Sequence, residues 1–339
     1  MQSNVRLPAE WEPQQGIMLA WPHEKTDWIH QLTQARHCVA TICTAIDLYE
    51  QVYLLHDPRD SSPRDYLQQP HTHNIQLIPC HFNDTWIRDY GPIAIDRHHQ
   101  VHLLNFQFNA WGEKFSFELD NHVNQYLDQH GFFKASMTSL PFVLEGGSIE
   151  SNGLDTLMTT QQCLQQRHPQ QSLNAIQTQL MQFFGMQHII MLKHGHLMGD
   201  DTDAHIDTLA RFFSPTGIVY MHCDDKNDPH YQDLQAMQKE LRALRTPIGK
   251  TYELQALPWP KAILNKSGQR LAASYANFLI INDAVLLPSY GLTTDVQAQQ
   301  VLASCFPNRR IVMIACETLI EQGGSLHCMT MQFPKGLIA

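Results

Sequence analysis

The stretch AVLLPSYGLTTDVQAQQVLASCFPNRRIVMIAC, residues 284–316, contains the unit from which the fold is predicted. Apolar runs at 284–289 and 311–316 have the length of buried strands, and residues 294–305 between them are expected to form a helix. Thr293 and Thr294 are candidate N-caps of this helix, and Asp295 lies in its first turn, where a carboxylate is favourable. The stretch therefore predicts strands separated by a single helix.

Similar strand-like runs and helical segments recur along the chain. Four further helices are expected near residues 27–49, 116–129, 171–184 and 229–244. The first has apolar residues at helical spacing, namely Trp28, Leu32, Ala35, Val39, Ile42 and Ile46. Strands that alternate with single helices predict an α/β or mixed α+β protein, and five helices among short strands fit five strand–helix units. No Gly/Ser linker or change of composition divides the chain, so residues 1–339 are expected to form one domain.

Composition limits the class of protein. Of the 339 residues, 43% are hydrophobic and 17% are charged, which allows a large core and argues against disorder. The formal net charge of −10 disfavours nucleic acid as a partner and favours small cations. The chain begins without an apolar signal segment and contains no membrane-spanning run. Eight cysteines without a CxxC pair are typical of reduced thiols, so we expect a cytoplasmic protein without a membrane partner.

The first polar segment that could carry chemistry is NDTWIRDYGP, residues 83–92. Asp84, Trp86 and Asp89 could surround a planar cation, because a carboxylate accepts paired N–H bonds from a guanidinium and an indole stacks on its face. The alternative is a capped turn in which Arg88 and Asp89 form a local ion pair. This segment alone does not separate the two interpretations.

The second segment is LEGGSIE, residues 144–150, in which two glycines allow the backbone next to Glu145 to pack tightly. Taken alone, the segment favours a β-bulge with a solvated glutamate.

The third segment is GDDTDAHID, residues 199–207. In extended chain, His205 and Asp207 point to the same side, which suits an acid/base beside a cation-binding carboxylate.

The third segment has two other interpretations. His194, His196, Asp200 and His205 could ligate a metal, although no HxxxH or HExxH spacing is present. The segment could also be a polar loop whose aspartates cap helices.

The fourth segment, GGSLHCMT at 323–330, contains Cys328. A lone cysteine is usually a buried apolar residue, but a cysteine, a distant histidine and several carboxylates are also the components of thiol catalysis.

Together these segments resemble the agmatine deiminase and bacterial peptidylarginine deiminase family. The motifs that carry the resemblance follow in the family's order, namely LPAEWEPQQGIMLAWPH, WIRDYGP, NFQFNAWGEKF, EGGSIE, LMTTQQCL, GDDTDAHIDTLARF, SYANFLIIN, LLPSYG and GGSLHCMT. The resemblance implies the pentein-type fold, a five-bladed α/β propeller with pseudo-five-fold strand–helix units and a central active site. The chain departs from the common pattern at Ser148, Glu150, Thr208 and Ser325 and in Thr-Met-Gln at 330–332. None of these positions is a catalytic group, so the departures concern the hydrogen bonds around the catalytic groups and the choice of substrate.

The resemblance also implies a role for each matching residue. Cys328 corresponds to the nucleophile, His205 to the acid/base, Glu145 to a carboxylate that orients it, and Asp89 and Asp207 to guanidinium-binding aspartates. Trp86 corresponds to a tryptophan that lines the substrate channel. No metal or organic cofactor is expected. A homo-oligomer is left open, because the sequence does not give the oligomeric state.

Substrate choice is predicted from NFQFNAWGEKF, residues 105–115. Peptidylarginine-directed relatives carry arginines just beyond the position of Asn109, whereas this chain has Trp111 and Glu113 there. The resemblance therefore implies hydrolysis of agmatine to N-carbamoylputrescine and ammonia, with Trp111 near the substrate and Asp84, Glu113 or Asp201 beside its amine. The alternatives are a deiminase of free or peptidyl arginine, a non-catalytic guanidine- or polyamine-binding protein, and a histidine-rich metal-binding protein.

Overall fold

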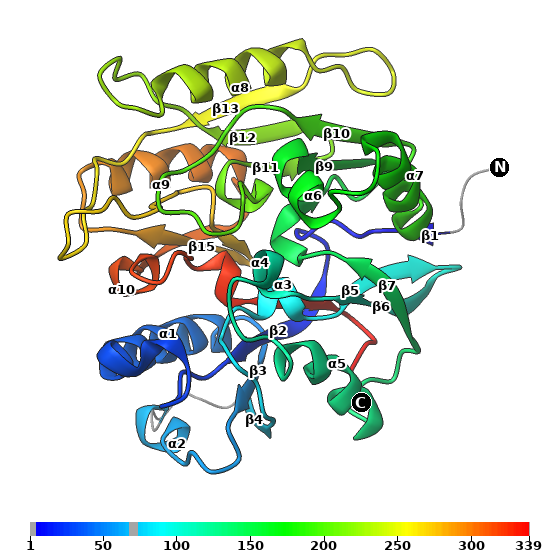
Figure 1. Ribbon diagram of the computed structural model, residues 1–339, viewed down its shortest axis with the longest axis vertical. Helices are drawn as coiled ribbons and strands as arrows, with labels where there is room; N and C mark the ends of the chain where they lie inside the picture. Colours follow the sequence, from blue (N-terminus) through cyan, green and yellow to red (C-terminus); the bar gives the residue numbers. More distant parts are fainter. Residues whose placement is uncertain (1–4, 68–73, 339) are drawn as a thin grey trace.

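Residues 5–67 and 74–338 are described by a computed structural model, in which strands and helices alternate along the chain (Figure 1). The strands of this described part form five separate sheets. Their orders are β1 (Val5–Arg6), β5 (Ile93–Arg97), β6 (Gln100–Gln107), β7 (Met137–Val143); β10 (His188–Leu192), β9 (Thr156–Thr160), β8 (Ile149–Ser151); β11 (Ala210–Ser214), β12 (Gly217–Met221), β13 (Glu253–Leu257); β14 (Leu279–Ile280), β15 (Ala284–Ser289), β16 (Arg310–Ala315); and β17 (Met331–Pro334), β2 (Gln14–Ala20), β3 (Gln51–His56), β4 (Ile75–Pro79).

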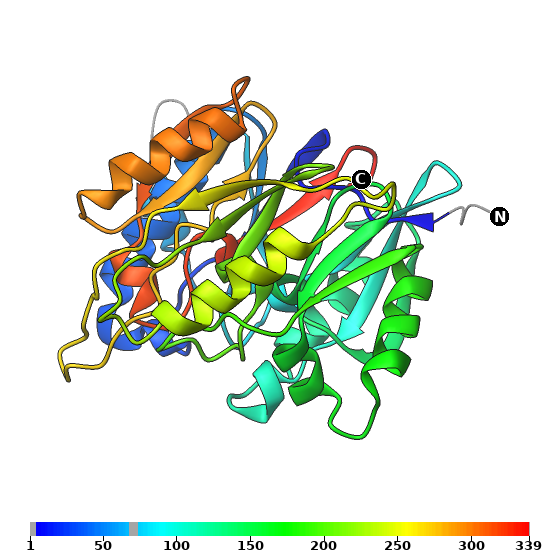
Figure 2. The same ribbon diagram turned by 90° about the horizontal axis from the view of Figure 1, so that it is seen from above.

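The same connection occurs once in every sheet. A long helix joins two strands that pair in parallel, next to a strand that pairs in antiparallel fashion. The five connections are β2–α1–β3, β6–α5–β7, β9–α7–β10, β12–α8–β13 and β15–α9–β16, with α1 at Leu32–Asp47, α5 at Asp120–Gln129, α7 at Leu173–Phe184, α8 at Tyr231–Ala243 and α9 at Thr294–Cys305. These are the five helices that the sequence predicts, and the mixed α/β class is confirmed. Figures 1 and 2 show α7 and α9 at opposite sides of the molecule.

The unit at residues 284–316 forms as expected except at its cap. β15 and β16 pair in parallel from Ala284 opposite Arg310 to Ser289 opposite Ala315. Thr293 precedes α9 with helical backbone angles, and its side chain makes no capping bond. An N-cap needs an extended backbone to turn its oxygen toward the free N–H groups. The carboxylate of Asp295 instead accepts hydrogen bonds from the backbone N–H groups of Tyr290 and Leu292.

The predicted apolar face of α1 is buried. Ala35, Val39, Ile42 and Ile46 lie in the largest core cluster. Trp28 is also fully buried, but it belongs to the short 3-10 helix Asp27–Gln31 that precedes α1. No helix in the two described ranges has both the length and the apolar character needed to cross a membrane.

Short helical turns fill the middle of the molecule, where Figure 1 shows α3 and α4. The short α-helices are α2 (Pro63–Tyr66), α3 (Ile87–Tyr90), α4 (Ala110–Glu113), α6 (Gln161–Arg167) and α10 (Glu317–Ile320), and the other 3-10 turns are Gly146–Ser148, Ile206–Thr208 and His327–Met329. Within this set, α3 contacts the turns Gly146–Ser148 and His327–Met329, and Gly146–Ser148 contacts Ile206–Thr208. Polar segments that are distant in sequence therefore meet at one place.

Candidate active site

Single helical turns hold the predicted catalytic residues. Asp89 lies in α3, Cys328 in the turn His327–Met329, and Asp207 in the turn Ile206–Thr208. His205 directly precedes its turn, and Glu145 directly precedes Gly146–Ser148. Residues 205–207 are therefore not extended, contrary to the prediction, because the chain turns immediately after His205.

The thiol of Cys328 is buried, with 4% of the residue exposed. Its sulfur lies 3.3 Å from Nδ2 of Asn277 and 3.7 Å from Oδ2 of Asp207. Burial raises the pKa of Cys328 well above its usual value, and the nearby charges of Asp207 and Asp89 raise it further. In the free protein this cysteine is therefore held as a neutral thiol.

Both carboxylate oxygens of Asp89 accept hydrogen bonds. Oδ1 accepts from the backbone N–H of Gly147 and Oδ2 from the indole N–H of Trp111, each at 2.9 Å. Burial is the main cause that raises the pKa of Asp89 to about 6. Arg88 points elsewhere, toward Gln332 at 2.6 Å and the backbone of His327, so the alternative interpretation of this segment as a local Arg88–Asp89 ion pair is wrong.

His205 is fully buried between two carboxylates. Its Nδ1 lies 3.7 Å from Oδ1 of Asp89 and its Nε2 lies 3.7 Å from Oε2 of Glu145, and neither nitrogen has a hydrogen-bond partner. Burial acts to lower the pKa of His205, but Asp89, Cys163 and Glu145 outweigh burial and raise it well above its usual value. The geometry therefore favours an imidazolium with two N–H groups still free to donate.

Glu145 is fully buried rather than solvated, which corrects the β-bulge interpretation of its segment. Its Oε1 accepts from Nε of Arg167 at 2.5 Å, and Arg167 also binds Asp203 at 2.7 Å. Burial acts to raise the pKa of Glu145, but His205 and Arg167 outweigh burial and lower it. Glu145 is thus an ionised group fixed behind the imidazole.

These groups converge on Gly147. A methyl group added to Gly147 would lie 2.7 Å from Nδ1 of His205, 2.8 Å from Oδ1 of Asp89 and 3.1 Å from Oδ2 of Asp207. Such distances exclude any side chain, so the second glycine of Glu-Gly-Gly lets the three groups approach one another. The structure thereby brings together the five residues predicted to be catalytic.

The predicted metal interpretation of the third segment does not match the structure. His194 and His196 are exposed and bind Glu240 and Asp233, whereas Asp200 caps the backbone of Thr202 and Ala204. A different set, Glu145, Cys163 and His205, places its donor atoms within 4.8 Å of one another. The guanidinium of Arg167 already contacts this Glu145, so a cation there would meet like charge.

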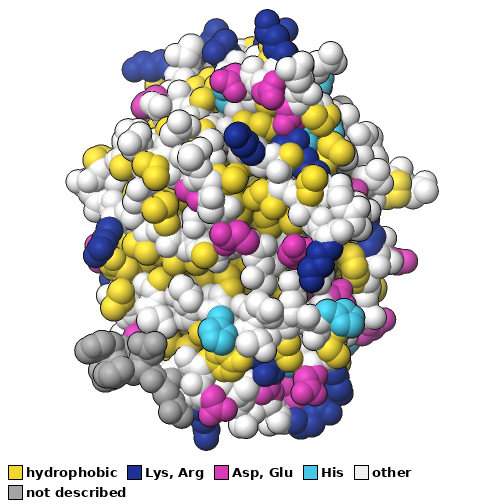
Figure 3. Space-filling model, turned by 90° about the vertical axis from the view of Figure 1, so that its left-hand side faces the viewer, with side chains coloured by type: hydrophobic (Ala, Val, Ile, Leu, Met, Phe, Trp, Pro, Cys, Tyr) yellow, Lys and Arg dark blue, Asp and Glu magenta, His cyan; other side chains and the backbone are white. Residues whose placement is uncertain are grey.

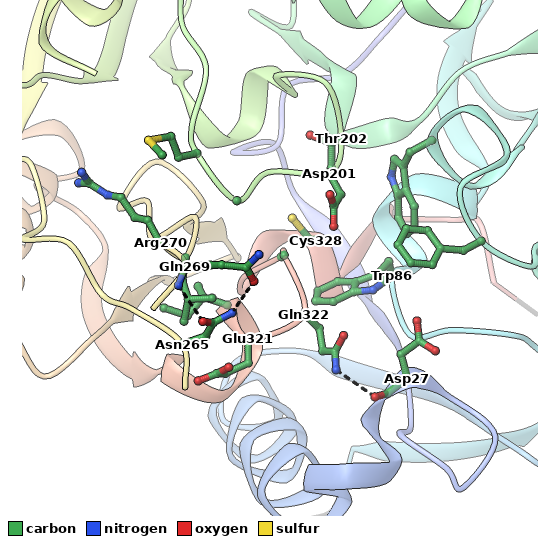
Figure 4. Close-up of a pocket in the computed structure, with 18 of the residues that line it drawn as sticks. Asp27, Trp86, Asp201, Thr202, Asn265, Gln269, Arg270, Glu321, Gln322 and Cys328 are labelled. Carbon is green, nitrogen blue, oxygen red and sulfur yellow. Dashed lines mark hydrogen bonds between the residues drawn. The ribbon is translucent and has the colours of Figure 1, made fainter. Parts of the chain in front are cut away.

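A cavity of about 740 Å³ leads from the surface to Cys328. Of the residues predicted to bind substrate or to be catalytic, Trp86, Trp111, Asp84, Asp89 and Asp201 line this cavity, and Asp27, Arg270 and Glu321 line it as well. Figure 4 shows Trp86 and Asp201 beside Cys328, with the guanidinium of Arg270 directed away from that sulfur. His205, Asp207 and Glu145 lie behind the inner wall. Figure 3 shows acidic side chains set among hydrophobic ones in the middle of one face.

Glu113 lies outside this cavity and is exposed, contrary to its prediction as a substrate-binding residue. Residues 110–113 all have positive φ, between 46° and 95°. Such angles are unfavourable for residues other than glycine, and strained turns of this kind occur at functional sites. The left-handed turn directs Trp111 inward to Asp89 and leaves Glu113 at the surface.

Several residues of the site carried no predicted role. Asn277 holds Cys328 and Asp207, Arg167 holds Glu145, and His327 contacts Asp207. Asn277 and His327 lie within motifs that support the family resemblance, whereas Arg167 lies just after one, and nothing in the local pattern indicates the partners of these residues. Two departures from the family pattern are also accounted for, since Glu150 binds Arg211 at 2.7 Å and Ser148 donates to the backbone of Glu145.

A buried thiol, an imidazole and paired carboxylates at the end of a cavity are the components of thiol catalysis. Comparison with known proteins shows that the chain is an enzyme that hydrolyses guanidino C–N bonds. The chain belongs to the Porphyromonas-type peptidyl-arginine deiminase family, whose sequence model matches residues 6–334. The predicted resemblance is thereby confirmed.

Individual relatives match nearly the whole chain. A Legionella pneumophila protein, provisionally named an agmatine deiminase, is 33% identical over 335 residues, which are 97% of this chain and 94% of that protein. A solved structure from Porphyromonas gingivalis, provisionally described as an arginine deiminase, is 41% identical with a TM-score of 0.93, covering 99% of this chain and 100% of that one. A substrate-bound cysteine-to-serine variant of the C. jejuni agmatine deiminase is 36% identical with a TM-score of 0.92, covering 98% and 97%.

A more distant structure shares only the fold. An amidinotransferase from Microseira wollei is 12% identical with a TM-score of 0.58, and the match covers 99% of each chain.

Proposed function

We propose that this protein is an agmatine deiminase, which hydrolyses the guanidinium of agmatine to N-carbamoylputrescine and ammonia. The convergence of His205, Asp89 and Asp207 over Gly147, with the sulfur of Cys328 3.7 Å from Asp207, is the observation that carries the proposal. The names of the agmatine deiminases from C. jejuni and Stutzerimonas stutzeri support it.

Asp89 and Asp207 bind the guanidinium in this proposal. The Oδ1 atom of Asp207 is buried without a hydrogen-bond partner, so an N–H group of the substrate satisfies it. Paired N–H bonds to two carboxylates hold the planar cation in one orientation. Trp86 lies beside the path of the substrate, where its ring contacts the planar face.

Cys328 loses its thiol proton to solvent when the substrate binds, and the thiolate then attacks the guanidino carbon and forms a C–S bond. His205 donates a proton to the departing nitrogen, the C–N bond breaks, and ammonia leaves an amidino-cysteine. His205 next accepts a proton from water, whose oxygen adds to the same carbon. The C–S bond breaks, the ureido product leaves, and the thiol is restored.

The substrate itself helps to form the thiolate. A cation about 4 Å from the sulfur contributes about 4 kcal/mol at an effective dielectric constant near 20, which is equivalent to about three pKa units. This effect opposes the burial and the negative charges that raise the pKa of Cys328 in the free protein. The protonated imidazole of His205 acts in the same direction.

The amine of agmatine is assigned to Asp84 or Asp201, both of which line the cavity. Burial raises the pKa of Asp84 to about 7, so a bound ammonium group would favour its ionised form. Burial also raises the pKa of Asp201, which is more exposed.

A deiminase of arginine is the second candidate, because the Porphyromonas gingivalis relative is so described and Arg270 lines the cavity. However, Arg270 is already paired with Asp228 at 2.8 Å and stacked on Trp259. A substrate carboxylate would therefore compete with a carboxylate that is already bound. The complete set of reacting groups disfavours a binding protein without activity.

We also propose that the five sheets are the blades of a propeller within one catalytic domain of residues 1–339. Each sheet repeats the same strand–helix–strand connection, and β17 pairs with β2, which joins the two ends of the chain in one sheet. The eight cysteines are all free thiols, which supports a reducing compartment such as the cytoplasm. The homo-oligomer stays a prediction.

The test is to incubate purified protein with agmatine, arginine and a peptide ending in arginine, and to measure ammonia and the ureido products. Release of N-carbamoylputrescine with ammonia supports the proposal, and conversion of arginine alone contradicts it. No metal is assigned a role, so activity should survive treatment with a chelator and dialysis. Activity that is lost and then restored by zinc would favour the Glu145, Cys163 and His205 group as a metal site.

A further inference from the structure

The imidazole of His327 lies between two buried carboxylates. Its Nδ1 is 2.8 Å from Oδ2 of Asp207, and its Nε2 is 2.8 Å from Oε2 of Glu10. All three residues are buried, and the two carboxylates are separated by almost 200 residues of sequence. His327 therefore connects the N-terminal motif LPAEWEPQ to the guanidinium-binding aspartate.

Two carboxylate acceptors require two donors from the ring. A neutral imidazole donates through only one nitrogen, whereas an imidazolium donates through both. Glu10 also accepts from Nη2 of Arg211 at 2.8 Å, and Nη2 of Arg88 lies 4.0 Å away. Burial acts to raise the pKa of Glu10, but Arg211 and His327 outweigh burial and lower it, so Glu10 is ionised. The geometry thus fits a charged His327 bound to two ionised groups.

These contacts divide the two oxygens of Asp207 between different tasks. Oδ2 accepts from His327 and, at 3.1 Å, from Nδ2 of Asn277. Oδ1 is buried and has no partner. Rotation of the carboxylate would break two hydrogen bonds, so Oδ1 keeps its place without a partner behind the inner wall of the cavity.

We infer that His327 is a positioning residue, which holds Asp207 so that its free Oδ1 accepts an N–H group of the substrate guanidinium. Glu10 and Arg211 hold His327 in turn, and Arg211 is itself fixed by Glu150 and by the backbone oxygen of Phe278 at 2.8 Å. This inference rests on the proposed function, because it concerns how the same guanidinium site is held.

Two substitutions separate the two hydrogen bonds of the ring. The amide nitrogen of asparagine lies close to the position of Nδ1, so His327→Asn keeps a donor for Asp207. The amide nitrogen of glutamine lies close to the position of Nε2, so His327→Gln keeps a donor for Glu10 and loses the bond to Asp207. A bond to a charged group is large enough that its loss lowers kcat/KM for agmatine by about tenfold to a hundredfold in the Gln variant, mainly through KM. The Asn variant should lie between the Gln variant and the wild type.

His23→Asn and His23→Gln are matched controls. His23 is also buried, but its ring packs at a tilt against Phe82 and lies outside the cavity that leads to Cys328. Both controls should keep the wild-type KM even if their thermal midpoints fall. These controls therefore show how the removal of a buried imidazole outside the site affects KM and the thermal midpoint.

A second readout does not depend on turnover. Chloroacetamidine carries an amidinium that the two aspartates can bind, whereas chloroacetamide is neutral, and both alkylate a thiol. The ratio of their rates at Cys328, measured by mass spectrometry, reports how well the carboxylates hold a planar cation. This ratio should fall in the order wild type, His327→Asn, His327→Gln.

The outcomes distinguish the inference from the proposed function. Wild-type protein that does not hydrolyse agmatine contradicts the proposed function, while the alkylation ratio still tests His327. A Gln variant with the wild-type KM and ratio overturns the inference. Equal losses in the Asn and Gln variants, with both reagents slowed alike, would show a purely structural role and would also overturn it.

Discussion

Trp111 donates its indole N–H to Oδ2 of Asp89 at 2.9 Å, from a turn in which four consecutive residues have positive φ. The ring thus lines the cavity and also holds one of the two carboxylates proposed to bind the guanidinium. The unfavourable backbone conformation of this turn therefore places the indole N–H of Trp111 beside the carboxylate of Asp89.

Trp111→Phe should lower kcat/KM for agmatine by about tenfold or more, because a hydrogen bond to a charged group contributes about 1.5–3 kcal/mol. The phenyl ring keeps much of the apolar contact, so the decrease in kcat/KM measures the contribution of the indole N–H hydrogen bond. Steady-state kinetics measure it. Trp21→Phe is the matched control, because Trp21 is a buried tryptophan that donates to Ser62 at 3.0 Å. Equal effects of the two substitutions would count against the role of Trp111.

The pH dependence follows from Asp89, whose pKa is raised to about 6, mainly by burial. This carboxyl group is neutral below its pKa and ionised above it, so guanidinium binding should weaken as the pH falls through about 6. A profile of kcat/KM, which reports groups of the free enzyme, should show this acid limb. Trp111→Phe should shift the limb to higher pH, because the lost hydrogen bond favoured the charged form. A flat profile from about pH 5 to 7 would disprove the assignment.

Cys328→Ala should abolish turnover, because no other group in the site can form the proposed covalent intermediate. Wild-type protein quenched with acid during turnover should carry an amidine adduct on Cys328, detected by peptide mass spectrometry. Cys305→Ala serves as the control, because Cys305 lies in α9 away from the cavity, and it should retain activity. Substantial turnover by the Cys328 variant would rule out the thiol mechanism.

Agmatine should be preferred over arginine by at least about 10²-fold in kcat/KM. A substrate carboxylate without a free cationic partner, near like charge, costs several kcal/mol, and each 1.4 kcal/mol is about tenfold. Asp84 and Asp201 line the cavity, whereas Arg88 points away to Gln332. Competition kinetics with both substrates measure the ratio. If arginine is used comparably, a selective loss of arginine turnover in Arg270→Ala would identify Arg270 as the carboxylate partner.

The local sequence pattern predicted the five long helices and the two strands of the unit at residues 284–316. Residues 284–289 and 294–305 form β15 and α9 at the bounds that were predicted, because apolar period and length are local properties of the chain. The motifs also indicated the site residues Cys328, His205, Asp89, Asp207 and Glu145 before any geometry was known.

Only the tertiary structure decided which neighbours of these residues point into the site. Trp111 and Glu113 are two residues apart, yet one lines the cavity and the other is exposed, because the left-handed turn sets their directions. His327 reaches Glu10, and Asn277 reaches Cys328, through contacts between segments that are far apart in sequence. Residue type and spacing limit what a side chain can do, but its partner depends on backbone angles and on packing between sheets, which no local pattern contains.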